Sequence, residues 1–171
     1  MLVMDNLDEP VLAELFSYWS ERCHGRPAPT RADIDPVDIP HLLPHIVLTE
    51  IVDGPGSGER RVRFRLAGTQ IEKHFGCVLA NRYLDELKRG NYLSYVMGLY
   101  ERLISEVRPL YTEDCFGDAL RAKRLMLPLS DDGRTVNMVL TGMIYSDSDP
   151  SRRSTVLHSQ DHFTQNLREA P

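Results

Sequence analysis

The chain is 171 residues long, a size that favours a single domain with its own hydrophobic core. Hydrophobic residues make up 42% and charged residues 26% of the sequence, which is close to the globular average and excludes wholesale disorder. The formal net charge is −5, so the chain lacks the dense basic surface of a protein that coats nucleic acid. We therefore expect no nucleic-acid partner.

The location of the protein is indicated by its first residues and its cysteines. The chain turns acidic at Asp5, without the basic and apolar stretches of a signal peptide, and it has no apolar run long enough to span a bilayer. Cys23, Cys77 and Cys115 are widely spaced and form no Cys-x-x-Cys pair, as is typical of a reducing compartment. These features predict a cytoplasmic protein that makes no membrane contact.

The first predicted element is a helix over residues 8–23, with Asp8 as its N-cap. Apolar side chains recur at helical spacing and form one stripe, which consists of Leu12, Leu15, Phe16 and Trp19. The stripe either packs into the core of the domain or forms a homodimer interface. Residues 25–36 are rich in proline and aspartate and predict a structured connection.

A β-hairpin is predicted after this connection. Residues 46–52 are rich in β-branched side chains, and in residues 61–66 arginines alternate with apolar residues, the period-two pattern of a strand with one buried face. The glycine-rich residues 54–58 lack the lysine of a phosphate-binding loop and predict the turn between the two strands.

Helices and then strands are predicted in the rest of the chain. Three helices are expected at residues 69–76, 84–87 and 93–107. The first of them begins at a capping box formed by Thr69 and Glu72. Three strands are expected at residues 110–116, 120–129 and 135–145, the last two joined by a tight turn. The remaining residues are polar and predict a mobile tail.

This order of elements resembles that of PAS domains, and in particular that of a family of small bacterial PAS-like proteins common in alphaproteobacteria. The residues that carry the resemblance are Trp19 and Gly25, Pro29-x-Arg31-x-Asp33-x-Asp35-Pro36, Leu42-Leu43-Pro44, Phe64-Arg65-Leu66-x-Gly68-Thr69, Gly76, and Leu127-Pro128-Leu129-Ser130. The resemblance covers roughly residues 15–145. At Asn81 the family pattern has glycine, and asparagine is the next best residue for a left-handed backbone conformation.

The resemblance implies an α+β fold: a PAS-like five-stranded antiparallel sheet with helices on one face and an N-terminal helix. It also implies a division of the chain into three parts. Residues 1–44 form the N-terminal helix and the proline- and aspartate-rich connection, residues 45–146 form the PAS-like core, and residues 147–171 form the polar tail.

Patterns for catalysis, metals and cofactors are weak. His41 and His45 are four residues apart, as are His158 and His162, but no cysteine or glutamate completes a metal site with either pair. His74 is a conceivable haem ligand, although its neighbours Ile71 and Phe75 occupy the inward face of that helix. No nucleophile elbow or comparable cluster is present. We therefore expect no catalytic residue and no metal, and we predict no cofactor.

A PAS fold can leave a cavity between its sheet and its helices, and apolar residues would line it. The candidates are Phe64, Leu66, Ile71, Phe75, Leu84, Met97, Tyr100, Leu125, Leu127, Met138 and Leu140. Tyrosines at 92, 100 and 111 would supply polar groups. The predicted ligand is a small, largely apolar molecule.

A second candidate site is a basic stripe across neighbouring strands. Its members are Arg61, Arg63, Arg65, Arg121 and Arg124, together with Lys123. The stripe is either a solvated sheet face that discourages edge pairing or a docking surface for an acidic protein or an anionic nucleotide.

The resemblance implies a non-catalytic sensory or adaptor module. It would act in signal transduction through contacts with separate signalling proteins, in a candidate homodimer, and would be gated by the apolar ligand. Two alternatives remain open at this point: a small-ligand α+β barrel enzyme, either an isomerase or a hydrolase, and a binder of a nucleotide second messenger at the arginine stripe. Two titratable side chains converging in a cavity would favour the enzyme.

Overall fold

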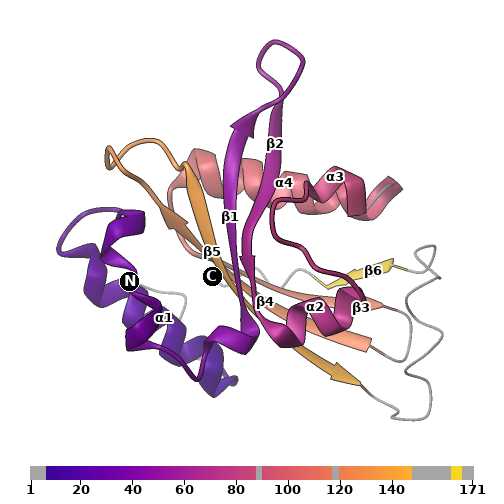
Figure 1. The fold of residues 1–171 in the computed structure, drawn as a ribbon, viewed down its shortest axis with the longest axis horizontal. Coiled ribbons are helices and arrows are strands. Elements are labelled where there is room, and N and C mark those ends of the chain that lie inside the picture. Colours follow the sequence, from indigo (N-terminus) through magenta and orange to yellow (C-terminus); the bar gives the residue numbers. More distant parts are fainter. Residues whose placement is uncertain (1–6, 88–89, 117–119, 148–162, 167–171) are drawn as a thin grey trace.

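The computed structural model describes residues 7–87, 90–116, 120–147 and 163–166 (Figure 1). Its helices are α1 (Pro10–Cys23), the short 3-10 helices η1 (Arg31–Asp33), η2 (Pro36–Asp38) and η3 (Leu43–His45), then α2 (Thr69–Phe75), α3 (Leu84–Leu87) and α4 (Gly90–Glu106). Its strands are β1 (Ile46–Asp53), β2 (Arg60–Ala67), β3 (Leu110–Phe116), β4 (Leu120–Leu129), β5 (Met138–Asp147) and β6 (Phe163–Asn166).

The strands form one sheet in the order β2-β1-β5-β4-β3-β6, in which neighbouring strands are antiparallel. The predicted five-stranded antiparallel sheet is confirmed as the order β2-β1-β5-β4-β3. The short strand β6 was not predicted; it comes from the polar tail and pairs with the outer edge of β3. Residues 148–162 and 167–171 of the predicted tail lie outside the described residues.

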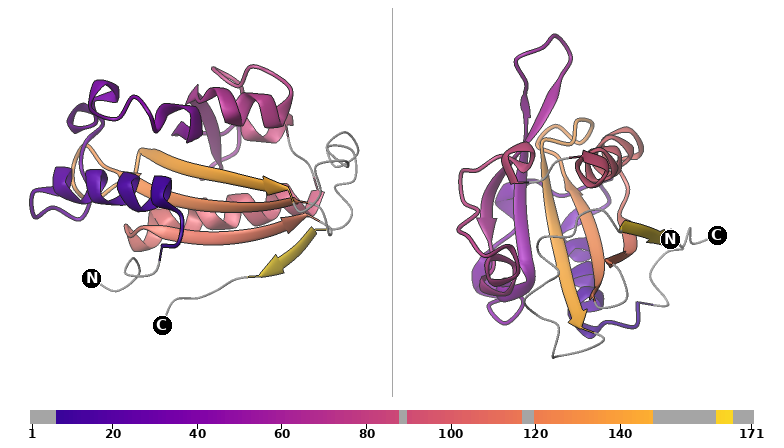
Figure 2. Two further views of the ribbon diagram at one scale, coloured as in Figure 1. Left: turned by 90° about the horizontal axis from the view of Figure 1, so that it is seen from below. Right: turned by 90° about the vertical axis from the view of Figure 1, so that its right-hand side faces the viewer.

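Each face of the sheet carries its own hydrophobic cluster, because successive side chains of a strand point to opposite faces. On the first face, here called the α4 face, Ile71 of α2 and Leu103 of α4 are buried against the strands. On the other, the α1 face, Leu12, Leu15 and Trp19 are buried. Figure 2 shows α1 and α4 on opposite sides of the strands. The predicted helical face and the separate N-terminal helix are both present.

Helix α1 lies directly on β5, because Gly142 leaves room for it. A Cβ atom built at Gly142 would lie 2.7 Å from the Cδ2 atoms of both Leu12 and Leu15, closer than such atoms approach in real proteins. The stripe predicted as core or interface is thus packed inside the domain: Leu12 and Leu15 are fully buried, Trp19 is 5% exposed, and Phe16 is partly buried. These four side chains stabilise the fold.

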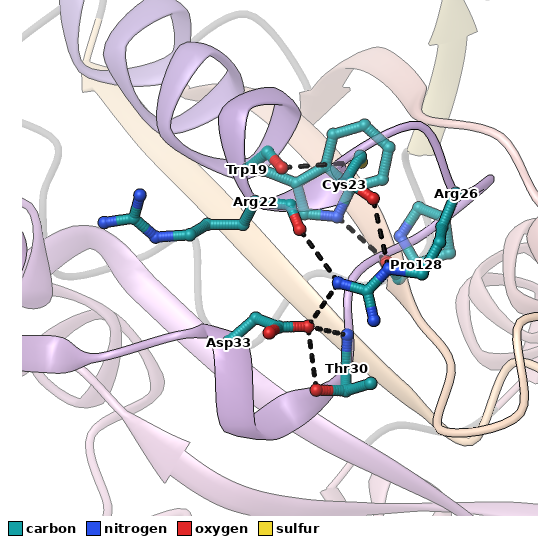
Figure 3. A network of polar contacts seen from close by, with 7 residues as sticks. All are labelled: Trp19, Arg22, Cys23, Arg26, Thr30, Asp33 and Pro128. Atoms are coloured by element: carbon teal, nitrogen blue, oxygen red, sulfur yellow. Dashed lines mark hydrogen bonds and ion pairs between the residues drawn. The ribbon is translucent and has the colours of Figure 1, made fainter.

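The proline- and aspartate-rich connection is held by a network of polar contacts (Figure 3). The indole Nε1 of Trp19 donates to the carbonyl of Pro128 at 2.9 Å and so ties α1 to β4. Asp33 Oδ2 accepts from the backbone N and the Oγ1 of Thr30, both at 2.8 Å, and from Arg26 Nη2 at 2.7 Å. The segment is therefore a structured connection, as its sequence indicates.

Two predicted helix caps were wrong. Helix α1 begins at Pro10 with Glu9 as its N-cap, and the Asp8 carboxylate instead accepts from Lys123 Nζ at 2.8 Å. Helix α2 has Gly68 as its N-cap, so Thr69 is already helical, and Glu72 Oε1 accepts from the backbone N of Leu79 at 3.0 Å. A side chain at position 68 could not fit, because its Cβ would lie 2.0 Å from the carbonyl oxygen of Leu43.

Most other predicted boundaries agree with the structure to within a few residues. The exception is the turn before β5, which is longer than a tight hairpin because the strand begins at Met138. Asp132 Oδ1 shapes this turn by accepting from Ser130 Oγ and from the backbone N atoms of Arg134 and Thr135. Asn81 has a positive φ of 65°, as expected of a position where the family pattern has glycine.

Candidate binding cavity

A cavity of about 40 Å³ lies on the α4 face, between the sheet and helices α2, α3 and α4. Its wall is mostly apolar, with three residues from α4, four from β4 and β5, and one each from β1, β2, α2 and α3. The lining residues are Val47, Phe64, Phe75, Leu84, Tyr92, Val96, Tyr100, Arg124, Met126, Thr141 and Met143. The space would hold a few water molecules or one small ligand.

Only some of the predicted lining residues line the cavity. Phe64, Phe75, Leu84 and Tyr100 line it. Ile71 and Met97 belong to the same hydrophobic cluster without lining the cavity. Leu66 is instead 38% exposed on β2.

Four predicted lining residues were placed on the wrong face of the sheet. Leu125, Leu127, Met138 and Leu140 pack in the cluster on the α1 face. The sequence from Arg124 to Leu129 is almost continuously apolar, so hydrophobicity does not tell which parity faces which helix. The side chains of β4 and β5 that do line the cavity belong to Arg124, Met126, Thr141 and Met143. They alternate along the strands with the four predicted residues and therefore point to the other face of the sheet. Of the three predicted tyrosines, Tyr92 and Tyr100 line the cavity, whereas Tyr111 packs on the α1 face.

A charged side chain forms part of the cavity wall. Arg124 is only 4% exposed, and its Nη2 atom donates to the hydroxyl of Tyr92 at 2.7 Å. The same Nη2 lies 2.9 Å from Oδ2 of the fully buried Asp114, forming an ion pair without hydrogen-bond alignment at that oxygen. Oδ1 of Asp114 accepts from the hydroxyl of Tyr95 at 2.8 Å. A buried ion-paired network therefore borders the cavity.

Three tyrosine hydroxyls tie α4 to three different strands. Tyr92 accepts from Arg124 of β4, Tyr95 donates to Asp114 of β3, and Tyr100 shares a 3.0 Å hydrogen bond with Thr49 of β1. A ligand in the cavity that lengthened or broke one of these hydrogen bonds would therefore change the position of α4 relative to the sheet.

The environment of this network shifts several pKa values. Burial raises the pKa of Tyr100 to about 12, and burial also raises the pKa values of Tyr92 and Tyr95. Burial by itself lowers the pKa of Arg124. The neighbouring Tyr92 and Asp114 raise it by more than burial lowers it, so the pKa of Arg124 lies above the ordinary value. At neutral pH the tyrosines are thus uncharged and Arg124 is a cation.

The predicted basic stripe does not form a continuous surface. Strands β2 and β4 are separated by β1 and β5, so their arginines are not on neighbouring strands. Arg124 is buried on the α4 face, whereas Lys123 points to the α1 face and contacts Asp8 and Glu9. Arg121 is exposed.

Three arginines of β2, Arg61, Arg63 and Arg65, are paired with acidic side chains. Arg61 donates to both carboxylate oxygens of Asp85 at 2.7 Å and lies over the ring of Tyr83. Arg63 donates to Glu50, and Arg65 lies 3.6 Å from the same carboxylate. The acidic partners neutralise much of the positive charge that would be needed to bind an anionic nucleotide.

Histidine side chains have contacts of their own. His41 Nε2 lies 2.7 Å from Glu14 Oε1, and His74 stacks on Tyr145 with ring centroids 3.7 Å apart. His158 and His162 lie outside the described residues. Within the described part of the chain, no three histidine, cysteine or acidic side chains gather as they would around a metal ion. In the same part, no helix combines the length and apolarity needed to cross a bilayer.

The comparisons with known proteins agree with this fold. A family model described as PAS domain matches residues 7–145, which include α1, both clusters and the cavity. A search of the curated proteins finds no match. Since the family model covers most of the chain and the sheet has the expected strand order, the chain belongs to the PAS domain family.

Proposed function

We propose that this PAS domain is a non-catalytic sensory or adaptor module that acts in the cytoplasm through contacts with signalling proteins. A small, largely apolar ligand in the cavity on the α4 face would gate it. PAS domains are in general sensory and signalling modules. The observation that carries the proposal is that α4 supplies three of the cavity-lining side chains and is tied to the sheet by tyrosine hydroxyls at the cavity wall.

The chemistry of the cavity favours binding over catalysis. A general acid or base works best when its pKa lies near the operating pH. Tyr92, Tyr100 and Arg124 are titratable and line the cavity, so the convergence that the enzyme alternative requires is present. The pKa of each, however, lies above its ordinary value. Arg124 and Asp114 neutralise each other. These groups suit recognition and positioning, not proton transfer at neutral pH.

The same cavity offers a route from ligand to output. A ligand can only shift a conformational equilibrium if it binds one conformer more tightly than the other. One that presses on Tyr92, Val96 or Tyr100 favours the position of α4 that accommodates it. The surface of α4 would then change for a partner protein.

The test uses the full chain with isotopically labelled methionine methyl groups. Met126 and Met143 line the cavity, and Met138 packs on the α1 face and serves as an internal control. We expect a screen of small uncharged compounds to shift the Met126 and Met143 signals saturably and to leave Met138 unchanged. A matched Val96→Phe variant, which fills the cavity, should show no such response.

If no compound moves Met126 or Met143 and Val96→Phe behaves as the parent does, the gating proposal fails. The domain would then be a constitutive adaptor.

A further inference from the structure

Two buried hydrogen-bonding groups at the cavity have no partner among the described residues. They are Nη1 of Arg124 and Oγ1 of Thr141, and each belongs to a residue that is 4% exposed. Both residues line the cavity. A buried donor left without an acceptor costs free energy, so these groups favour an occupant that can bond to them.

The sheet register brings the two groups to the same wall. Arg124 on β4 lies opposite Met143 on β5, and Thr141 lies opposite Met126, which is the next residue of β4 on the same face. Arg124 and Thr141 are therefore diagonal neighbours, a separation that the long arginine side chain can bridge. The register therefore places both residues side by side in the same wall of the cavity.

The charge of the site excludes an anionic occupant. The guanidinium of Arg124 is already balanced by Asp114, and Arg124 is the only cation among the described lining residues. A carboxylate in the cavity would add a buried negative charge with no counterion, which is costly. The acceptor must therefore be uncharged.

The size of the cavity and the polarity of its wall narrow the class of ligand further. The volume of about 40 Å³ admits only a short molecule, and most of the wall consists of apolar and aromatic side chains. Arginine can only donate, whereas the threonine hydroxyl can donate as well as accept. A carbonyl oxygen has two lone pairs and can accept from both.

We propose that the cavity binds a short, uncharged carbonyl compound, with its oxygen accepting from Arg124 Nη1 and Thr141 Oγ1 and its carbon chain against the apolar wall. This inference rests on the proposed function, whose cavity it fills. Because Tyr92 accepts from the other nitrogen of Arg124, the ligand would be linked to α4 through one side chain.

The test compares three probes of matched size and shape: acetone, acetate and isobutene. Each is titrated into the full chain while the methyl signals of Met126, Met143 and the control Met138 are followed. We expect acetone to bind more than about tenfold more tightly than isobutene, because only acetone offers an acceptor to the guanidinium. Acetate should bind more weakly than acetone.

A variant separates the carbonyl contact from general cavity binding. Thr141→Val keeps the shape of the side chain and removes the hydroxyl. It should therefore lower the affinity for acetone about three- to tenfold and leave the affinity for isobutene unchanged. Thr135→Val, at an exposed threonine before β5 that does not line the cavity, should bind all three probes as the parent does.

The outcomes distinguish the two proposals. Tighter binding of isobutene or of acetate, or an acetone affinity that is unaffected by Thr141→Val, would overturn the carbonyl assignment and leave the cavity as a ligand site. If no probe and no compound of the wider screen shifts the methyl signals of Met126 and Met143, both the carbonyl assignment and the proposal of a ligand-gated cavity are overturned.

Discussion

Arg124 of β4 and Asp114 of β3 form an ion pair inside the domain, with Nη2 and Oδ2 2.9 Å apart and both side chains at least 95% buried. The pair lies on the α4 face, where Tyr92 and Tyr95 of α4 bond to its two members. It therefore joins the cavity wall to the helix above it. Burying two charges is favourable only when their remaining groups are also bonded, which makes this pair sensitive to change on either side.

Breaking the pair from one side should be costly. Arg124→Met leaves the Asp114 carboxylate buried and unpaired, and we expect a loss of about 3–5 kcal/mol in the free energy of unfolding. Arg124→Met combined with Asp114→Asn removes both charges and keeps an acceptor for Tyr95, so most of the loss should be recovered. Urea denaturation of the parent, the single variants and the double variant measures this. Additive losses would show that the two side chains are not coupled.

The close packing of α1 on β5 predicts that Gly142→Ala is destabilising. The new Cβ would meet the methyl groups of Leu12 and Leu15 at 2.7 Å, so these two side chains or α1 must shift, at a cost of about 1–3 kcal/mol. Gly98→Ala is the matched control, because its Cβ would meet nothing within 4 Å and α4 would gain a better helix former. Thermal unfolding should therefore move in opposite directions for the two variants. Equal melting temperatures would contradict the described docking of α1.

The stripe on α1 is predicted to act in folding. Leu15→Asp places a charge at a fully buried position of α1 that packs against β5, so we expect the free energy of unfolding to fall by about 4 kcal/mol or more. Ser20→Asp, at an exposed position of the same helix, should unfold like the parent. Circular dichroism during denaturation reports the loss, and sedimentation reports any homodimer. A folded, equally stable Leu15→Asp chain that only loses self-association would instead make the stripe an interface.

Stability should fall in acid in a way that depends on Asp33. Hydrogen bonds from the backbone and hydroxyl of Thr30, and then from Arg26, lower the pKa of Asp33 from its ordinary 3.8 to about 2. The unfolded chain therefore binds this proton at a higher pH than the folded one, so the contribution of Asp33 is present above about pH 4 and is lost as the pH falls towards 2.

The measurement is urea unfolding at several pH values between 5 and 2. Asp33→Asn should be less stable than the parent at pH 5, and the difference should shrink as the pH falls. Asp53→Asn, at an exposed position that ends β1, is the control and should keep the pH dependence of the parent. A constant difference between Asp33→Asn and the parent across this range would show that the lowered pKa does not contribute.

Local sequence patterns predicted the elements well and the site only in part. The alternation at Arg61, Arg63 and Arg65 identifies β2, and the spacing of Leu12, Leu15 and Trp19 identifies α1, because each pattern has one buried side. In β4 the apolar residues continue through both parities after Arg124, so the sequence does not show which of them meet α4. This is why Leu125 and Leu127 were placed in the cavity.

The buried ion pair was missed for a related reason. Arginine is rarely buried, so Arg124 was grouped with Arg121 and Lys123 as a surface residue. A signal was nevertheless present: Arg124 has the same parity as Leu120, Ala122 and Met126, which are all buried. Its partner Asp114 lies on another strand, and only the sheet register brings them together.

The most direct test of the sensory role is amide hydrogen exchange along α4 with the cavity empty and filled. A compound that shifts Met126 and Met143 is added at saturation, and exchange is compared in the parent and in Val96→Phe. If the cavity gates the domain, filling it changes the protection of α4 in the parent, and Val96→Phe does not respond. If the compound binds and the protection of α4 stays the same, the cavity is not coupled to the helix and the domain is not a sensor of its occupant.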